Sequence, residues 1–382
     1  YAGAERGFYV SFNGGTNWNK LQLNFPVVPI TDLISHDNDL VASTAGRAFW
    51  ILDDLSPIQQ SRGTFGTSAV KIYAPKPTVR LTSFAPSWME VPAGTGQNPM
   101  NGVILTYHLK EKADTAKVAL EILDMSGNVI RKYSNKKDES VKPFPGGAPP
   151  SPQIPAEAGM NRFAWDFKTE PLPDVPGVYV YGDLGGHRVA PGKYKARMKF
   201  KNEVSETEFD LVPDPNLINV TAADWTTQQQ VIQQAEDGLR DIHNSVNNMR
   251  KVKKQIEGYN DLLKNDPNAK DLLNAGKEII KKLEKWEKEL IEPRSKNFQD
   301  VINFENKLNS EFLQIKSNAD THDPRVTQGV RDRLGDIQID WSKQKNVMNE
   351  VINKDISNYN KTFKDKNLPA LITELKEMVI SN

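Results

Sequence analysis

The chain has 382 residues, and its 49 basic and 49 acidic side chains give a formal net charge of zero. At about 100 to 200 residues per domain, this length predicts two or three domains. A balanced charge disfavours binding to nucleic acid, which needs a basic excess on one face, and the absence of cysteine excludes disulfides and thiolate catalysis. No stretch approaches the roughly 18 consecutive apolar residues of a membrane span.

The first 60 residues predict short β-strands separated by turns. Residues 7–12 and Trp18 flank the polar turn 13–17, which is typical of a β-hairpin. Residues 30–34 and 40–43 form a second pair, and residues 47–52 supply a further strand. We expect one sheet, too small to be stable alone. We expect this sheet to be one blade of a repeat whose other blades lie upstream of Tyr1. Tyr1 would then be an internal or processed start of the protein.

The turn in this region resembles an Asp-box, the S-x-D-x-G-x-x-W hairpin of sialidase-like and sortilin-like β-propellers. Its positions are Ser11, Asn13, Gly15 and Trp18, with Asn where Asp is usual. We expect a structural role, because a short polar side chain can hydrogen-bond the tight turn. The resemblance implies that Trp18 packs between blades.

Residues 41–58 resemble the last blade of bacterial BNR-repeat proteins of the sortilin-like propeller superfamily, many of which are labelled glycosyl hydrolases. That family usually has a His before the Gly-Arg pair, and this chain has Ala45. This departure further weakens the idea of an ionisable catalytic group on the strand.

Residues 61–215 predict a β-sandwich from alternating strands. The expected strands are residues 103–109, 117–123, 129–133, 161–167, 192–200 and 206–212. Residues 142–155 are rich in Pro and Gly, so we expect an exposed connection without a central strand. The segments 159–166 and 190–194 are similar to immunoglobulin-like or fibronectin type III-like modules, which implies a spacer or docking role.

Residues 216–382 predict an antiparallel helical bundle, because the apolar period changes from two to about three and a half. Thr221 and Asp224 resemble a capping box at the first helix start. A second helix should end before Pro293, a third contains Phe312, and a fourth starts near Pro324. Residues 298–304 also resemble the C-terminal region of the BNR family.

Few residues suggest chemistry. The five histidines, His36, His108, His187, His243 and His322, lack metal-binding spacing, and Asp53 and Asp54 fit a polar turn better than a general acid/base pair. Trp88 and Trp165 could stack on sugars, although buried aromatics are commoner. Residues 114–116 match a short bacterial O-glycosylation motif at Thr115. We expect no catalytic residue, metal or cofactor in this chain.

The sequence therefore favours a noncatalytic scaffold or interaction region of a secreted or cell-surface propeller protein of a Gram-negative bacterium. The rest of the propeller would be its partner, and the propeller would recognise protein or glycan ligands. One alternative is an accessory region of a sialidase-like glycoside hydrolase whose active site lies in the missing blades. Another is a subunit of an outer-membrane assembly, which exposed apolar residues on the helices would favour.

Overall fold

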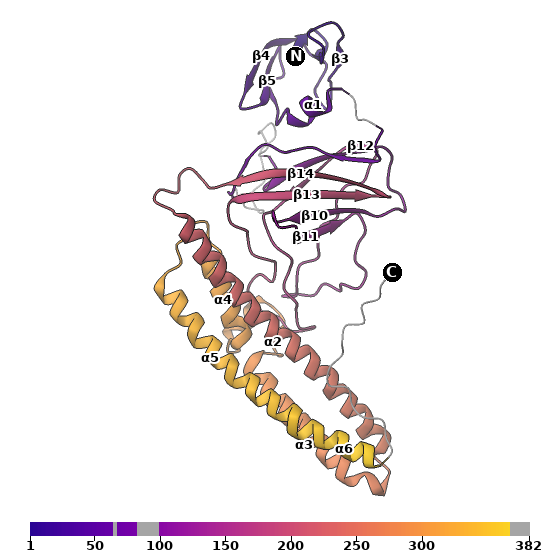
Figure 1. Ribbon diagram of the computed structural model, residues 1–382, viewed down its shortest axis with the longest axis vertical. Helices are drawn as coiled ribbons and strands as arrows, with labels where there is room; N and C mark the ends of the chain where they lie inside the picture. Colours follow the sequence, from indigo (N-terminus) through magenta and orange to yellow (C-terminus); the bar gives the residue numbers. More distant parts are fainter. Residues whose placement is uncertain (64–66, 82–98, 367–382) are drawn as a thin grey trace. The chain divides into compact units, whose positions relative to one another are not determined.

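The structure, a computed structural model, describes residues 1–63, 67–81 and 99–366. It divides into two compact units. The sheet unit comprises Tyr1–Asp138, Ser151–Thr169 and Arg188–Ile218, and the helical unit comprises Glu139–Pro150, Glu170–His187 and Asn219–Asn382. The chain therefore contains both sheets and helices, with the strands in its first part and the long helices in its last (Figure 1).

The N-terminal strands form two antiparallel sheets of three strands each, so the expectation of a single sheet was wrong. The first contains β1 (Ala2–Ala4), β2 (Gly7–Val10) and β3 (Asn19–Lys20), and the second contains β4 (Ile30–His36), β5 (Asp39–Thr44) and β6 (Phe49–Leu52). The prolines at 26 and 29 lie between β3 and β4, where they cannot donate to a ladder.

The two N-terminal sheets share a small apolar core. It is centred on Phe8, Phe25, Leu40, Ala42 and Leu55, which come from both sheets, the connection between them and the residue before α1 (Ser56–Ser61). β1 lies close to β4, because a Cβ atom added to Gly3 would lie only 2.5 Å from a methyl carbon of Ile30. A sheet therefore already covers the inner face of β4–β6.

Two larger sheets follow and share one core. Their strand orders are β11-β10-β13-β14-β8 and β12-β9-β7. The strands are β7 (Val70–Ile72), β8 (Thr78–Val79), β9 (Val103–Leu109), β10 (Val118–Leu123), β11 (Val129–Ser134), β12 (Gly159–Trp165), β13 (Gly192–Phe200) and β14 (Glu203–Val212). The six strands predicted here are confirmed to within a few residues, whereas β7 and β8 were not predicted.

The helices also follow the predicted pattern. They are α2 (Ala222–Leu263), η1 (Pro267–Ala269), α3 (Lys270–Leu290), η2 (Phe298–Ile302), α4 (Leu308–Ala319), α5 (Gln328–Glu350), the π-helical η3 (Val351–Ile356) and α6 (Ser357–Asp365). The Thr221 side chain accepts from the Asp224 amide, and the Asp224 carboxylate accepts from the Thr221 amide, so the capping box is confirmed. The second helix ends at Leu290, before Pro293.

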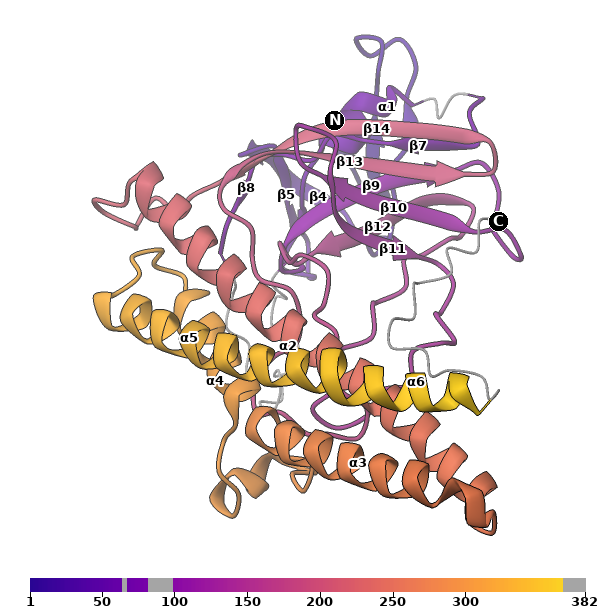
Figure 2. The ribbon, with the colours of Figure 1, turned by 60° about the horizontal axis from the view of Figure 1, so that its bottom comes forward.

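Contacts along α2 fix the helix directions. Arg250 and Lys253 bind Glu287 and Glu284 of α3, so those two helices are antiparallel. α4 also runs against α2, since Gln228 binds the Ala319 carbonyl at the end of α4. α5 and α6 run along α2, because Trp341 binds Asp241 and Phe363 contacts Tyr259 (Figure 2).

The helical unit includes two segments from the first half of the chain, 139–150 and 170–187. Neither forms a strand, as predicted for the Pro/Gly-rich part of the first. The second contributes five side chains to the helical core, namely Leu172, Val175, Val178, Val180 and Leu184.

Candidate interaction surface

The Asp-box-like turn is held by its own polar side chains. The Ser11 hydroxyl accepts from the Gly15 amide at 2.8 Å, and Oδ1 of Asn13 accepts from the Asn17 amide at 2.9 Å. Ser11 also donates its hydroxyl to Oδ1 of Asn13. Gly15 has a φ of +91°, which explains the glycine. These hydrogen bonds give the turn a structural role. Trp18, the last position of the turn motif, is 47% exposed in this chain.

The acidic residues after β6 also hold a turn. Asp39 accepts from the Asp54 amide at 2.8 Å and from Nζ of Lys76 at 3.0 Å, and Asp54 accepts from the Ser56 amide at 3.0 Å. Burial raises the pKa of Asp39, but the Asp54 amide and Lys76 bind its charged form and hold the pKa below its ordinary value. Asp39 and Asp54 are thus occupied in local structure.

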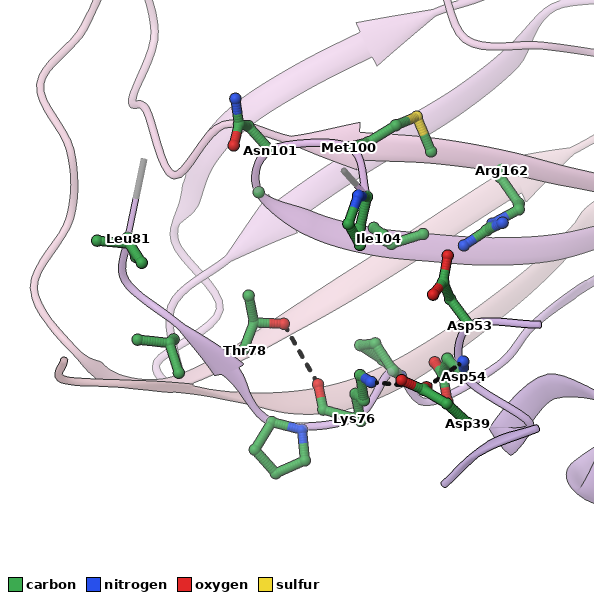
Figure 3. A pocket seen from close by; sticks show the side chains of 15 residues that line it. Asp39, Asp53, Asp54, Lys76, Thr78, Leu81, Met100, Asn101, Ile104 and Arg162 are labelled. Carbon is green, nitrogen blue, oxygen red and sulfur yellow. Dashed lines mark hydrogen bonds and ion pairs between the residues drawn. The ribbon is translucent and has the colours of Figure 1, made fainter. Parts of the chain in front are cut away.

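A pocket of about 450 Å³ lies beside this turn in the sheet unit. Apolar residues such as Val79 and Ile104 line much of it, and Asp53 and Arg162 point toward one another across it (Figure 3). A glycosidase needs two carboxyl groups about 5 to 9 Å apart and both available to the substrate. With Asp39 and Asp54 engaged, the described lining of this pocket leaves Asp53 as a single available carboxylate.

The outer face of the β4–β6 sheet carries a row of apolar side chains. The strand register places Ile34 opposite Val41 and Val41 opposite Ile51, so these residues form a line across three strands. Phe49 lies two residues before Ile51 and therefore on the same face. Phe49 is 75% exposed, Ile51 is 59% exposed and Ile34 is 56% exposed. Clustered exposed apolar residues of this kind mark interaction sites.

The same sheet ends in an edge strand. β6 pairs with β5 and occupies the end of the strand order. Among the described residues, the backbone of Phe49–Leu52 makes hydrogen bonds to β5 alone. An edge strand points alternate N–H and C=O groups away from its sheet, where another strand can pair with them.

The outward side chains of the five-stranded sheet differ sharply from this apolar face. Glu121 on β10 binds Arg197 and Lys199 on β13, and Arg197 also binds Glu206 on β14. A further pair joins Lys193 to Asp210. Cross-strand ion pairs of this kind suit a solvated surface, so the apolar row on β4–β6 is not a general property of the sheets.

A short element of the helical unit also exposes apolar side chains. η2 exposes Phe298 to 62% and Ile302 to 83%, and Asn297 and Asp300 cap it reciprocally. It is a second, smaller candidate surface.

The remaining predicted residues lie in separate places. Trp165 is buried and donates to the Lys168 carbonyl, so it is not a sugar platform, and Trp88 lies outside the described residues. Thr115 is exposed in the connection between β9 and β10. His187 and His243 are buried in the helical unit. In the part of the chain that the structure describes, no three His, Asp or Glu side chains gather as metal ligands.

Comparison with known proteins identifies no relative. A scan against protein-family models, a search of curated proteins and a search of solved structures each gave no match. Among the described helices, none combines the length and the apolar character needed to cross a membrane.

The sequence reasoning missed the apolar row because it treated residues 47–52 only as a closing strand. A signal was present in Phe49, Trp50, Ile51 and Leu52. Four consecutive apolar residues in a strand indicate that both faces are to be covered. The structure covers the face that carries Trp50 and Leu52 and leaves the other exposed.

Proposed function

We propose that this chain is a noncatalytic scaffold and interaction region of a secreted or cell-surface BNR-type propeller protein. The two N-terminal sheets would be consecutive blades, and the outer face of β4–β6 would pack against a further apolar sheet of the same propeller. The observation that carries this proposal is the apolar row of Ile34, Val41 and Ile51, in which Ile34 and Ile51 are exposed, with the exposed Phe49 beside it.

The packing of the first two sheets supports this choice of partner. The inner face of β4–β6 is covered by the three-stranded sheet β1–β3 through a shared apolar core. A sheet whose two faces are both apolar is stable when both are covered, so a second sheet on the outer face would repeat the same contact. The free edge of β6 would accept a strand at the same seam.

The larger sheets and the helices fit a supporting role. An immunoglobulin-like sandwich with an ion-paired outer face would be a solvated spacer. The engaged carboxylates beside the pocket support a noncatalytic region. An extracytoplasmic location with Thr115 as an O-glycosylation site fits the exposure of that residue. Protein or glycan ligands would bind the propeller.

The proposal is tested by carbene footprinting of the protein isolated from its source organism, compared with this chain expressed alone. We expect labelling of Phe49 and Ile51 to fall at least fivefold in the native protein, because a neighbouring sheet covers them. Leu262, which is 80% exposed in the helical unit, is the control and should label equally in both samples.

Equal labelling of Phe49 and Ile51 in the two samples would overturn the docking role of this face. Hydrolysis of nitrophenyl glycosides by this chain alone would contradict its noncatalytic character. The two outcomes are independent of one another, since the first concerns the β4–β6 face and the second concerns a reaction.

A further inference from the structure

The segment 170–187 joins two strands of the sheet unit, β12 and β13, but it lies in the helical unit. Its first part contains Pro171, Pro173 and Pro176. Proline has no N–H and holds the residue before it in an extended conformation, so this stretch presents carbonyl oxygens with few backbone donors. A surface that binds it through its backbone must therefore supply donors.

One face of α2 supplies such donors in register with the segment. Nδ1 of His243 donates to the Pro173 carbonyl at 2.7 Å, and Nδ2 of Asn247 donates to the Asp174 carbonyl at 2.8 Å. One turn further along the helix, Arg250 donates to the Pro176 carbonyl at 3.2 Å. Residues four and three apart share a helix face, so one stripe of α2 follows three carbonyls in chain order.

His243 is held in one tautomer for this contact. A carbonyl can only accept, so Nδ1 carries the proton, and Nε2 accepts from Nδ2 of the Asn309 side chain at 3.1 Å. Burial lowers the pKa of His243, which favours the neutral ring that the bond accepted at Nε2 requires.

Donors on other elements continue the pattern. Nζ of Lys296 donates to the Gly177 carbonyl at 2.6 Å, and Nζ of Lys316 on α4 donates to the carbonyls of Asp183 and Gly185 at 2.9 and 2.6 Å. The segment ends at His187, whose ring bonds the buried Glu236 carboxylate at 3.0 Å. Six carbonyls of the segment, between Pro173 and Gly185, thus accept from side chains of the helical unit.

The apolar side chains of the segment lie in the helical core. Leu172, Val175 and Val178 are buried among helical residues such as Leu239 and Phe312. Gly182 lies against Leu313 so closely that a Cβ atom there would be 2.6 Å from a methyl carbon. Hydrogen bonds to the backbone together with buried apolar side chains are features that peptide-recognition sites use.

We propose that the helical unit is a groove for a proline-containing loop, and that residues 170–187, which turn at residues 175–178 and pair Leu172 with Leu184, are its built-in ligand. The groove binds the backbone of the segment through hydrogen-bond donors on α2, α4 and the α3–α4 connection. It binds the apolar side chains of the segment by packing them in its core. This inference is independent of the proposed function, since every residue involved lies in the helical unit.

Hydrogen exchange in the full chain tests the backbone contacts. The variant N247A/K296M removes two carbonyl donors without touching the core. We expect the backbone amides of residues 174, 175 and 177–180 to exchange at least tenfold faster, since each bond contributes about 1 kcal/mol. The matched control N248A/K288M changes exposed residues of the same types on α2 and α3 and should alter exchange by less than twofold.

A second measurement tests recognition in trans. In the full chain, residues 171–186 are replaced by a Gly-Ser linker of equal length, and a fluorescein-labelled peptide with the sequence of residues 170–187 is added. We expect saturable binding to the replaced chain and at least tenfold weaker binding to the wild type, whose groove is filled. A peptide with Ala at positions 171, 173 and 176 is the control and should bind less tightly.

Unchanged exchange of the segment in N247A/K296M would overturn the proposal, and so would a replaced chain that is helical and unfolds cooperatively by circular dichroism yet does not bind the peptide. Should the replaced chain fail to fold, the exchange experiment decides alone.

Discussion

At the residue scale, single polar side chains in this protein hold local structure. Asn13 fills the position of the usual Asp in the hairpin turn, and its Oδ1 accepts from the Asn17 amide as a carboxylate would. Short side-chain acceptors of this kind stabilise a turn without a core. The turn therefore tolerates exposure to solvent.

Replacing Asn13 with Ala should destabilise the hairpin by about 1 kcal/mol, because one net hydrogen bond is lost. The control N13D keeps an acceptor and should stay within about 0.5 kcal/mol of the wild type. Amide exchange of β2 and β3 measures the difference. Equal destabilisation by both variants would show that the acceptor is not what matters.

His243 makes the helical unit sensitive to acid. Burial lowers its pKa in the folded state below the ordinary value of about 6.5. Below that pH the unfolded chain gains a proton that the folded chain does not take up, so stability falls as pH drops from about 6.5 toward the folded pKa.

We expect the melting temperature of the helices, followed by circular dichroism, to fall between pH 7.5 and 5.5. In the variant H243Q this fall should be smaller, although H243Q itself is less stable at pH 7.5. The exposed His36 provides the control H36Q, which should keep the wild-type slope. A slope unchanged in H243Q would assign the acid sensitivity to another group.

At the element scale, the exposed and buried faces of one helix give opposite outcomes for the same substitution. Gly238 and Gly258 both lie inside α2. A Cβ atom at Gly238 would lie 2.3 Å from the ring of the buried Phe312, whereas one at Gly258 would meet no atom within 4 Å. Gly238 therefore permits the close approach of α4, and Gly258 has no such role.

G258A should stabilise the helical unit by up to about 1 kcal/mol through helix propensity. G238A should destabilise it by about 1 to 3 kcal/mol, because the core is overpacked by more than propensity returns. Thermal unfolding of the two variants checks the signs. A stabilising G238A would mean that Phe312 moves aside freely.

At the scale of the whole molecule, the two units are interleaved along the chain. The backbone passes between them after residues 138, 150, 169, 187 and 218. The helical core includes Leu172, Val178 and Leu184, which precede the first helix of that unit in sequence. A cut near residue 215 would therefore separate the helices from part of their own core.

A fragment of residues 216–382 should show less helix per residue than the same region in the full chain, and a lower melting temperature. The lost burial of five apolar side chains is the physical reason. Circular dichroism at 222 nm measures it, with a fragment of residues 139–382 as the control that retains both segments. Native-like melting of 216–382 would contradict this expectation.

The sequence by itself determined most of the larger strands and the long helices of this protein. Alternation of apolar residues located six strands of the larger sheets, and the three-to-four-residue period with Pro293 and the Thr221 capping box located the helices. These features depend on local periodicity and local hydrogen bonds, which a sequence displays directly. The polar role of Asp54 was also local and was predicted.

Only the tertiary structure decided which surfaces those elements contact and which of their faces stay exposed. The division of the first strands into two sheets, the exposed face of Phe49 and Ile51, and the capture of residues 170–187 by α2 all join positions far apart in the chain. The period of the apolar residues shows which face of an element is apolar, but it does not show which surface, if any, covers that face. A proline-containing connection is expected from its sequence to be exposed to solvent. Its burial becomes evident only when the fold shows the donors that bind its carbonyls.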